Sequence, residues 1–249
     1  MKTTLSDIAH IEPFIIRTYD IDHQKICNIP ALIKLMDEAA MQNVLNLKMS
    51  VWDLEVDKIT WVLMRKRLKI NRLPNLGERI NIFTTPAGFE KYFTYRDYKV
   101  YAENGDLIAW SSSTWLLMDT EKRRMTRIPD HILTIKEKMP TQEDCLERPE
   151  RKLPKFGMID FSKTYKIGWY DLDFNGHLNN VFYSKWMLEV TPQEVLKNKK
   201  LIDFKIEYRL EGLLNEEITS EVQQIDESTF LHRLVRDGKE LALGITVWA

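Results

Sequence analysis

Two segments of the chain place apolar residues at the spacing of one helix face. The first stripe consists of Ala31, Leu32, Leu35, Met36, Ala39 and Ala40. In the second segment Val181, Phe182, Lys185, Trp186 and Glu189 follow the same spacing, although Lys185 and Glu189 are charged. A run that is typical of a β-strand precedes each stripe, at residues 14–21 and 163–170. The pattern therefore predicts two helices, each entered from a strand.

Behind each predicted helix come four runs rich in β-branched and aromatic residues, which favour strands. They cover 61–70, 79–85, 91–101 and 107–117 in the first half, and 203–210, 217–225, 229–236 and 240–248 in the second. Asn104–Gly105 and Asp237–Gly238 each separate two such runs, and these dipeptides favour tight hairpins. A helix followed by an antiparallel meander predicts an α+β unit whose sheet wraps the helix.

The two halves also match each other residue by residue. A shift of 151 positions places Tyr19 to Asp22 on Tyr170 to Asp173 and, without a gap, Asn28 on Asn179. Near the end of each half a smaller offset places Trp115 on Trp248. Two collinear blocks of this kind indicate a duplication, so we predict two copies of one fold.

The stretch between the copies has a different composition. Prolines recur through it, and residues 142–152 are almost wholly polar, as expected for a surface linker. The predicted organisation is an N-terminal unit over residues 1–135, a linker over 136–155 and a C-terminal unit over 156–249.

Composition and charge exclude several classes of function. Of the 249 residues 44% are hydrophobic and 29% are charged, which is typical of a globular protein, and the net charge of −1 provides no overall basic field for nucleic acid. The two cysteines and five histidines lack the spacing of a zinc site, and the glycines are too far apart for a phosphate-binding loop. We expect no metal, no cofactor and no nucleic-acid partner.

Signals for export or for membrane insertion are not recognisable. The first residues, Met1 to Asp7, lack the apolar stretch of a signal peptide. The longest uncharged run, Leu107 to Met118, is shorter than the roughly 20 residues that a membrane helix needs. Two lone cysteines fit a reducing compartment. We expect a soluble, cytoplasmic protein with no membrane span.

The copies differ at one place, directly before the second helix. The second copy carries a polar cluster from Asp171 to Asn180, whereas the first has Gln24 and Ile26 in the positions of Asn175 and His177. Singly, these residues have structural explanations, such as a turn or a helix N-cap. Together they place carboxylate, carboxamide and imidazole groups beside a helix N-terminus, where N–H donors can hold an oxyanion. We interpret the cluster as a site that occurs once per chain.

A second candidate lies in the next predicted strand. Alternation places Glu207, Arg209 and Glu211 on one face. An exposed polar face is the better interpretation for the first two. Glu211 falls near Leu73 in the alignment of the copies, so it is specific to the second copy. It could serve as a general base for water if it faces the histidine.

The cluster from Asp171 to Asn180, followed by a helix and by Glu207 to Glu211, resembles the acyl-acyl-carrier-protein (acyl-ACP) thioesterases of the plant and bacterial type. Trp61–Val62, Pro74 and Gly77–Glu78 resemble the N-terminal half of that family. The resemblance implies a tandem hot-dog fold and hydrolysis of fatty acyl-ACP to free fatty acid and ACP. The catalytic set that it implies is Asp173, Asn175, His177 and Glu211.

Plant members of the family have a cysteine after the glutamate, where this chain has Gly212. Attack by water is therefore favoured over a cysteine nucleophile. We expect Glu211 and Asp173 to orient and deprotonate the water, and Asn175, His177 and helix N-terminal N–H groups to bind the carbonyl oxygen. Whether His177 acts as a base or as a donor stays open, because its protonation depends on its neighbours.

The resemblance also suggests how the substrate binds. Asn179 and Asn180 would adjoin it, and the N-terminal half would shape an apolar acyl slot. The candidate slot residues are Met36, Ala39, Ala40 and Trp61.

The carrier protein is acidic, so its docking surface should be basic. The candidates are Arg65–Lys66–Arg67, Lys122–Arg123–Arg124 and Lys197–Asn198–Lys199–Lys200. The absence of a transit segment suggests a bacterial protein, and a homodimer is left open.

Two alternatives remain at this stage: a hot-dog thioesterase acting on acyl-CoA, and a non-catalytic module that binds acyl chains or the carrier. A hot-dog dehydratase is disfavoured, since the chain contains no Pro–Gly pair.

Overall fold

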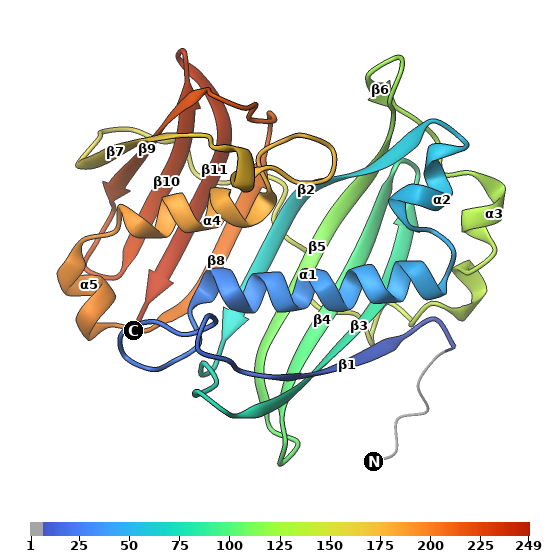
Figure 1. Ribbon diagram of the computed structural model, residues 1–249, viewed down its shortest axis with the longest axis horizontal. Helices are drawn as coiled ribbons and strands as arrows, with labels where there is room; N and C mark the ends of the chain where they lie inside the picture. Colours follow the sequence, from blue (N-terminus) through green and yellow to red (C-terminus); the bar gives the residue numbers. More distant parts are fainter. Residues whose placement is uncertain (1–6) are drawn as a thin grey trace. The chain divides into compact units, whose positions relative to one another are not determined.

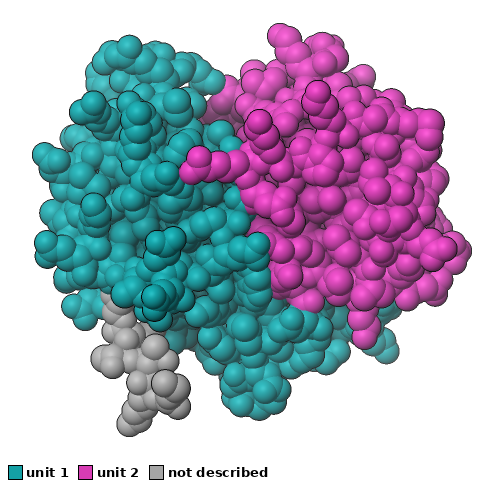
Figure 2. Space-filling view, turned by 180° about the vertical axis from the view of Figure 1, so that it is seen from behind, with its two compact units in different colours: residues 1–66, 71–149 teal, residues 67–70, 150–249 magenta. Residues whose placement is uncertain are grey.

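The computed structural model describes residues 7–249. Residues 1–6, which belong to the N-terminal stretch where a signal peptide was not recognisable, lie outside the described residues. The chain divides into two compact units, which Figure 2 colours separately. The first runs up to Lys66 and adds Asn71–Pro149, and the second comprises Arg67–Ile70 and Glu150–Ala249. Within residues 7–249, no helix combines the length and the apolar character required to cross a bilayer.

The first unit is an antiparallel sheet with a long helix lying across it (Figure 1). The strand order is β1-β3-β4-β5-β2, β6 pairs with β5, and α1 packs against β1 and β3. Its elements are β1 (His10–Ile15), α1 (Ile29–Asn46), α2 (Val51–Glu55), β2 (Ile59–Ile70), β3 (Arg79–Glu90), β4 (Phe93–Ala102), β5 (Leu107–Asp119), β6 (Arg124–Met125), α3 (Asp130–Leu133) and the 3-10 helix η1 (Lys136–Lys138).

The second unit repeats this plan with shorter elements. Its strand order is β7-β9-β10-β11-β8, which matches the first unit position by position, and α4 packs against β9 and β10. Its elements are β7 (Phe161–Lys166), the 3-10 helix η2 (Trp169–Asp171), α4 (Asn180–Glu189), α5 (Gln193–Asn198), β8 (Leu201–Tyr208), β9 (Glu217–Gln224), β10 (Thr229–Arg236) and β11 (Lys239–Trp248). The duplication and the α+β, tandem hot-dog fold are confirmed.

The predicted apolar face is right for the first helix and only partly right for the second, where Val181 and Trp186 are buried as predicted. In α1 every predicted stripe residue is buried except Leu35, which is half-buried. In α4 the side chains of Phe182 and Lys185 are only half-buried and contact each other, and Glu189 is exposed. Leu32 and Met36, which are buried in α1, correspond to Tyr183 and Met187 in the second copy. These two residues are buried in α4.

The eight strands predicted behind the helices all form, whereas the strand before each helix ends earlier than predicted. β1 ends at Ile15 and β7 at Lys166, because an aspartate folds the chain back in each copy. The Asp20 carboxylate accepts the Arg17 N–H at 2.7 Å, and the Asp171 carboxylate accepts the Gly168 N–H at 2.8 Å. Side chains that bond to nearby backbone compete with the sheet ladder.

Part of the predicted surface linker is instead an ordered strap on the first unit. The buried Asp97 carboxylate accepts the Leu146 N–H at 2.8 Å and pairs with Arg148 at 3.1 Å. The Ser112 hydroxyl donates to the Glu147 carbonyl at 2.6 Å. Polar groups of this stretch therefore bond to β4 and β5, in addition to contacting water.

His232 is a titratable group in the core of the second unit. It lies in β10, is fully buried, and its Nε2 is 2.8 Å from the Thr246 hydroxyl. Burial lowers its pKa to about 3, because the charged imidazolium would lose its hydration.

Acid should therefore destabilise this unit through His232. The unfolded histidine takes up a proton below about pH 6.5 and the folded one does not, so stability is lost as the pH falls from there towards 3. Between about pH 7 and pH 5.5 we expect the wild type to lose about 1 kcal/mol more unfolding free energy than His232→Gln. Urea denaturation of both proteins at both pH values measures this difference, and equal losses would contradict it.

Candidate active site

The polar cluster forms a tight loop organised by one carboxylate. Asp173 Oδ1 accepts the backbone N–H groups of Asn175 at 2.8 Å and of His177 at 3.1 Å. The Asp173 N–H donates to the His177 carbonyl at 2.7 Å, and Gly176 supplies the left-handed conformation, with φ of +76°, that closes the turn. This network fixes the backbone on both sides of Asn175 and His177.

The first copy folds the same loop without the same chemistry. Asp22 Oδ1 accepts the N–H groups of Gln24 at 2.8 Å and of Ile26 at 3.5 Å. Lys25 takes the left-handed position, with φ of 66°. This loop forms in the first copy, although Gln24 and Ile26 stand there in the positions of Asn175 and His177. The conformation of the loop is therefore enough to explain why an aspartate occurs in both copies. That observation weakens the water-orienting role expected of Asp173.

Asn179 is the N-cap of α4, one of the structural explanations that the sequence left open. Its side-chain oxygen accepts the Val181 N–H at 3.0 Å, as Asn28 accepts the Ala31 N–H in the first copy. Asn180 is the first residue of α4 and is half-buried.

Most backbone donors around this helix start are already engaged. The N–H groups of residues 175–179, and those of Val181 and Phe182, all donate to acceptors within the loop or helix, or to Gly212. These groups do not match the oxyanion donors expected from the helix N-terminus. Asn175 is exposed and His177 is half-buried, so solvent reaches both residues.

Glu211 lies beside the histidine, but it does not lie on a strand. β8 ends at Tyr208, so the predicted alternation stops before Glu211, which belongs to the loop leading to β9. Its Oε2 is 3.4 Å from His177 Nε2, and both side chains are about one-third exposed. The pair therefore contacts both protein and solvent, as a hydrolytic site requires.

The backbone shows that Glu211 is specific to the second copy. The Leu178 N–H donates to the Gly212 carbonyl at 2.8 Å, and in the first copy the Cys27 N–H donates to the Pro74 carbonyl at 2.9 Å. Glu211 therefore corresponds to Leu73, as the sequence comparison indicated. Arg209 pairs with both Glu207 and Glu240, so these charges form the expected solvated face.

The predicted acyl-slot residues fall into two separate groups. Met36, Ala39 and Ala40 are buried on the sheet-facing side of α1. Trp61 is half-buried and packs instead on a cluster around Met49 and Leu54, at the C-terminal end of that helix.

Buried polar groups that the sequence pattern did not indicate lie beneath the same helix. Lys66, which is 2% exposed, pairs with Asp37 at 2.5 Å. Arg96 is buried and donates to Asn43 at 2.8 Å and to the Thr84 hydroxyl at 3.0 Å. The available signal was the presence of charged residues inside runs that are otherwise typical of strands, Lys66 within 61–70 and Arg96 within 91–101.

The predicted basic cluster Arg65–Lys66–Arg67 is not a surface patch. Besides the buried Lys66, Arg67 is 5% exposed and forms a two-point ion pair with Asp203, at 2.8 and 3.1 Å. A carrier protein cannot reach these two charges. The cationic side chains of Lys122–Arg123–Arg124 and of Lys197 and Lys200 are exposed, whereas Lys199 donates to the Glu227 carbonyl.

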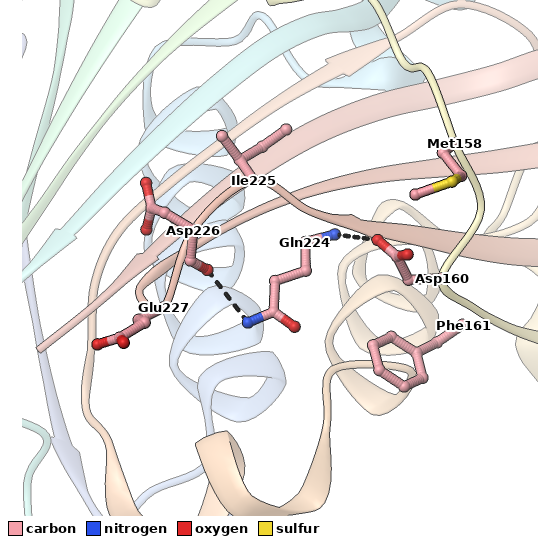
Figure 3. Close-up of a pocket in the computed structure, with 7 residues that line it drawn as sticks. All are labelled: Met158, Asp160, Phe161, Gln224, Ile225, Asp226 and Glu227. Atoms are coloured by element: carbon pink, nitrogen blue, oxygen red, sulfur yellow. Dashed lines mark hydrogen bonds between the residues drawn. The ribbon is translucent and has the colours of Figure 1, made fainter.

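A separate pocket of about 550 Å³ lies at the opposite end of β9 from Glu211. It is lined by Met158, Asp160, Phe161, Gln224, Ile225, Asp226 and Glu227 (Figure 3). Gln224 lies at its centre, where its backbone N–H donates to Asp160 and its side chain donates to the Asp226 carbonyl. Across residues 7–249, His, Cys, Asp and Glu side chains form no group of three that could hold a metal ion.

Neither cysteine has the properties of a nucleophile. Burial, with the nearby Asp20 and Asp22 carboxylates, raises the pKa of Cys27 to about 12. Burial also raises the pKa of Cys145, which lies in the strap. A reactive cysteine needs the opposite shift towards the thiolate.

Comparison with known proteins identifies the family of the chain. The family model for the acyl-ACP thioesterase N-terminal domain matches residues 8–135, and the model for the C-terminal domain matches residues 158–249. The chain belongs to the acyl-ACP thioesterase family.

Individual family members cover nearly the whole chain. A chloroplastic palmitoyl-ACP thioesterase of Cuphea hookeriana is 30% identical over 94% of the chain, and the chain spans 61% of that protein's length. A chloroplastic oleoyl-ACP thioesterase of Arabidopsis thaliana is 26% identical over 98% of the chain, which spans 77% of its length.

Solved structures share the fold. The acyl-ACP thioesterase of Bacteroides thetaiotaomicron aligns with a TM-score of 0.88 and 18% identity, covering 97% of this chain and 98% of that one. The 12:0-ACP thioesterase of Umbellularia californica aligns with a TM-score of 0.87 and 22% identity, covering 98% of each chain.

In this acyl-ACP thioesterase family member, neighbouring side chains fill the space at Gly212, beside the glutamate. A Cβ atom on Gly212 would lie 2.7 Å from Ile167 Cδ1, 3.1 Å from Ile218 Cδ1 and 3.2 Å from Leu178 Cβ. A cysteine at this position therefore requires its neighbours to move.

We expect Gly212→Cys to lower the unfolding free energy by roughly 1–3 kcal/mol through overpacking. Ile167→Val removes the closest atom, so the double variant should regain part of that loss, and Ile167→Val alone serves as the control. Urea denaturation of the four proteins decides this. Undiminished stability of Gly212→Cys would show that the packing tolerates a side chain there.

Proposed function

We propose that the chain hydrolyses the thioester of fatty acyl-ACP, releasing free fatty acid and ACP, by direct attack of water. The observation that carries this proposal is the 3.4 Å approach of His177 Nε2 and Glu211 Oε2. It occurs in the copy that departs from the repeat, within a chain of the acyl-ACP thioesterase family. The relatives' names supply the substrate class.

In the proposed reaction Glu211 is the general base. Its carboxylate accepts a proton from water as the water oxygen bonds to the thioester carbonyl carbon. Charge develops on the carbonyl oxygen, where the Asn175 carboxamide and a His177 N–H can donate to it. The carbon–sulfur bond then breaks and the thiolate takes the proton from Glu211. The backbone N–H groups of the loop already donate to other acceptors, which supports assigning the oxyanion donors to side chains. Asp173 keeps the loop in place.

The acyl chain is proposed to lie in the first unit, along the face of α1 that carries Met36, Ala39 and Ala40. The ion pair of Lys66 with Asp37, and Arg96 beside Asn43, adjoin that face. An acyl chain that displaced these bonds would leave buried charges unpaired, which is unfavourable, so these side chains would limit how far it extends.

The proposed reaction requires Glu211 to act as the general base. We expect Glu211→Gln to lower kcat for acyl-ACP by roughly 10²–10⁴-fold, the range for loss of a general base. Glu217→Gln, which changes an exposed carboxylate at the start of β9, is the matched control. Near-normal turnover of Glu211→Gln would remove the role proposed for this residue.

A substrate panel separates the remaining alternatives. Free thiol and free fatty acid should both appear with acyl-ACP, and faster turnover of acyl-CoA would instead favour the CoA thioesterase. Binding of acyl-ACP without release of either product would favour a non-catalytic module.

Carrier docking is proposed at one of the two exposed basic clusters, at residues 122–124 or at Lys197 and Lys200. Charge reversal at the true cluster should raise KM for acyl-ACP and leave turnover of a small thioester unchanged, with a weaker effect at high salt. Lys152→Glu, on an exposed lysine outside both clusters, is the control. Unchanged KM in both reversed variants would rule out both surfaces.

A cytoplasmic location, a bacterial source and a homodimer stay predictions. Sedimentation of the purified chain would decide the last of these.

A further inference from the structure

The segment that carries Glu211 has no strand to hold it, yet its backbone is bonded on every side. The Tyr183 hydroxyl donates to the Leu210 carbonyl at 3.0 Å and accepts the Gly212 N–H at 3.0 Å. Arg236 Nη1 donates to the Glu211 carbonyl at 3.1 Å, and the Leu178 N–H donates to the Gly212 carbonyl at 2.8 Å. One tyrosine hydroxyl therefore bridges the residues before and after Glu211.

We infer that Tyr183 is a positioning residue for Glu211. Tyr183 lies in the first turn of α4, which begins directly after the loop that holds His177. Its ring is 3% exposed and meets Tyr208, at the end of β8, edge-on at 5.4 Å between centroids. The side chain thus ties the loop that carries Glu211 to the helix that follows His177.

Comparison of the two copies separates this contact from the general requirements of the fold. The bond from Leu178 to Gly212 has a counterpart in the first copy, from Cys27 to Pro74, so the hot-dog unit uses it with or without Glu211. Tyr183 corresponds to Leu32, which is fully buried and has no hydroxyl. The hydroxyl bridge therefore occurs only in the copy that also has the histidine and the glutamate.

A phenylalanine at this position would fill almost the same space and remove only the bridge. The Leu210 carbonyl and the Gly212 N–H would then lose their partner, and an unpaired buried backbone group is unfavourable. The segment would relax towards water, and Glu211 would leave its place beside His177. Misplacement of a reacting group by about 1 Å can reduce the rate by about 10²-fold.

The consequence for catalysis rests on the function proposed above, so the experiment has two readouts. In Tyr183→Phe we expect faster hydrogen exchange of the Gly212 amide, measured by NMR. With acyl-ACP we expect kcat to fall by roughly 10- to 100-fold while KM stays unchanged.

Tyr165→Phe is the matched control, because Tyr165 donates its hydroxyl to Glu189 at 3.1 Å, away from the Glu211 segment. It should leave both the Gly212 exchange and kcat unchanged. Unchanged Gly212 exchange in Tyr183→Phe would overturn the inference, and so would a rise in KM at constant kcat. A wild-type chain with no thioesterase activity would refute the proposed function alone, because exchange still decides whether Tyr183 holds the segment.

Discussion

The candidate site depends on an aspartate carboxylate that accepts N–H groups from its own loop. Asp173 holds the loop in the second unit, and Asp22 holds its counterpart in the first. Such a bond replaces the water that these backbone groups would otherwise bind, and it does not depend on what the intervening side chains are. The loop can therefore carry either packing residues or reactive ones.

The duplication acts as an internal control for the assignment of roles. Asp173 makes the same two loop bonds as Asp22, and Asn179 caps its helix as Asn28 does, so their place in the motif is explained by loop closure and helix capping. His177 and Glu211 have apolar counterparts, Ile26 and Leu73, and their contact is not needed for the fold. A motif can thus combine residues that shape a loop with residues that act on a substrate.

The sequence predicted the repeat and the strands behind each helix, because periodicity and self-similarity are local or collinear signals. It also indicated His177 and Glu211, which the structure brings together. It placed Glu211 on a strand because alternation does not reveal where a ladder stops. It placed Lys66 on the surface because the partner that permits its burial, Asp37, lies on another element. It did not reveal Tyr183, since a tyrosine in an amphipathic helix is usually ordinary core, and only the fold brings its hydroxyl to residues 210 and 212.

At three positions of the second unit's site, a side chain with hydrogen-bonding groups stands where the first unit has an apolar one. Ile26, Leu32 and Leu73 are replaced by His177, Tyr183 and Glu211. Each change exchanges an apolar side chain for one with hydrogen-bonding groups, which costs stability unless those groups find partners. The tyrosine hydroxyl bonds to the backbone on both sides of the glutamate, and these bonds offset the cost of burying it. The histidine and glutamate are half-exposed and face each other, where water can complete their bonding. The polar groups that the fold requires are thus bonded within the protein, and those left open to water are the ones to which we assign the chemistry.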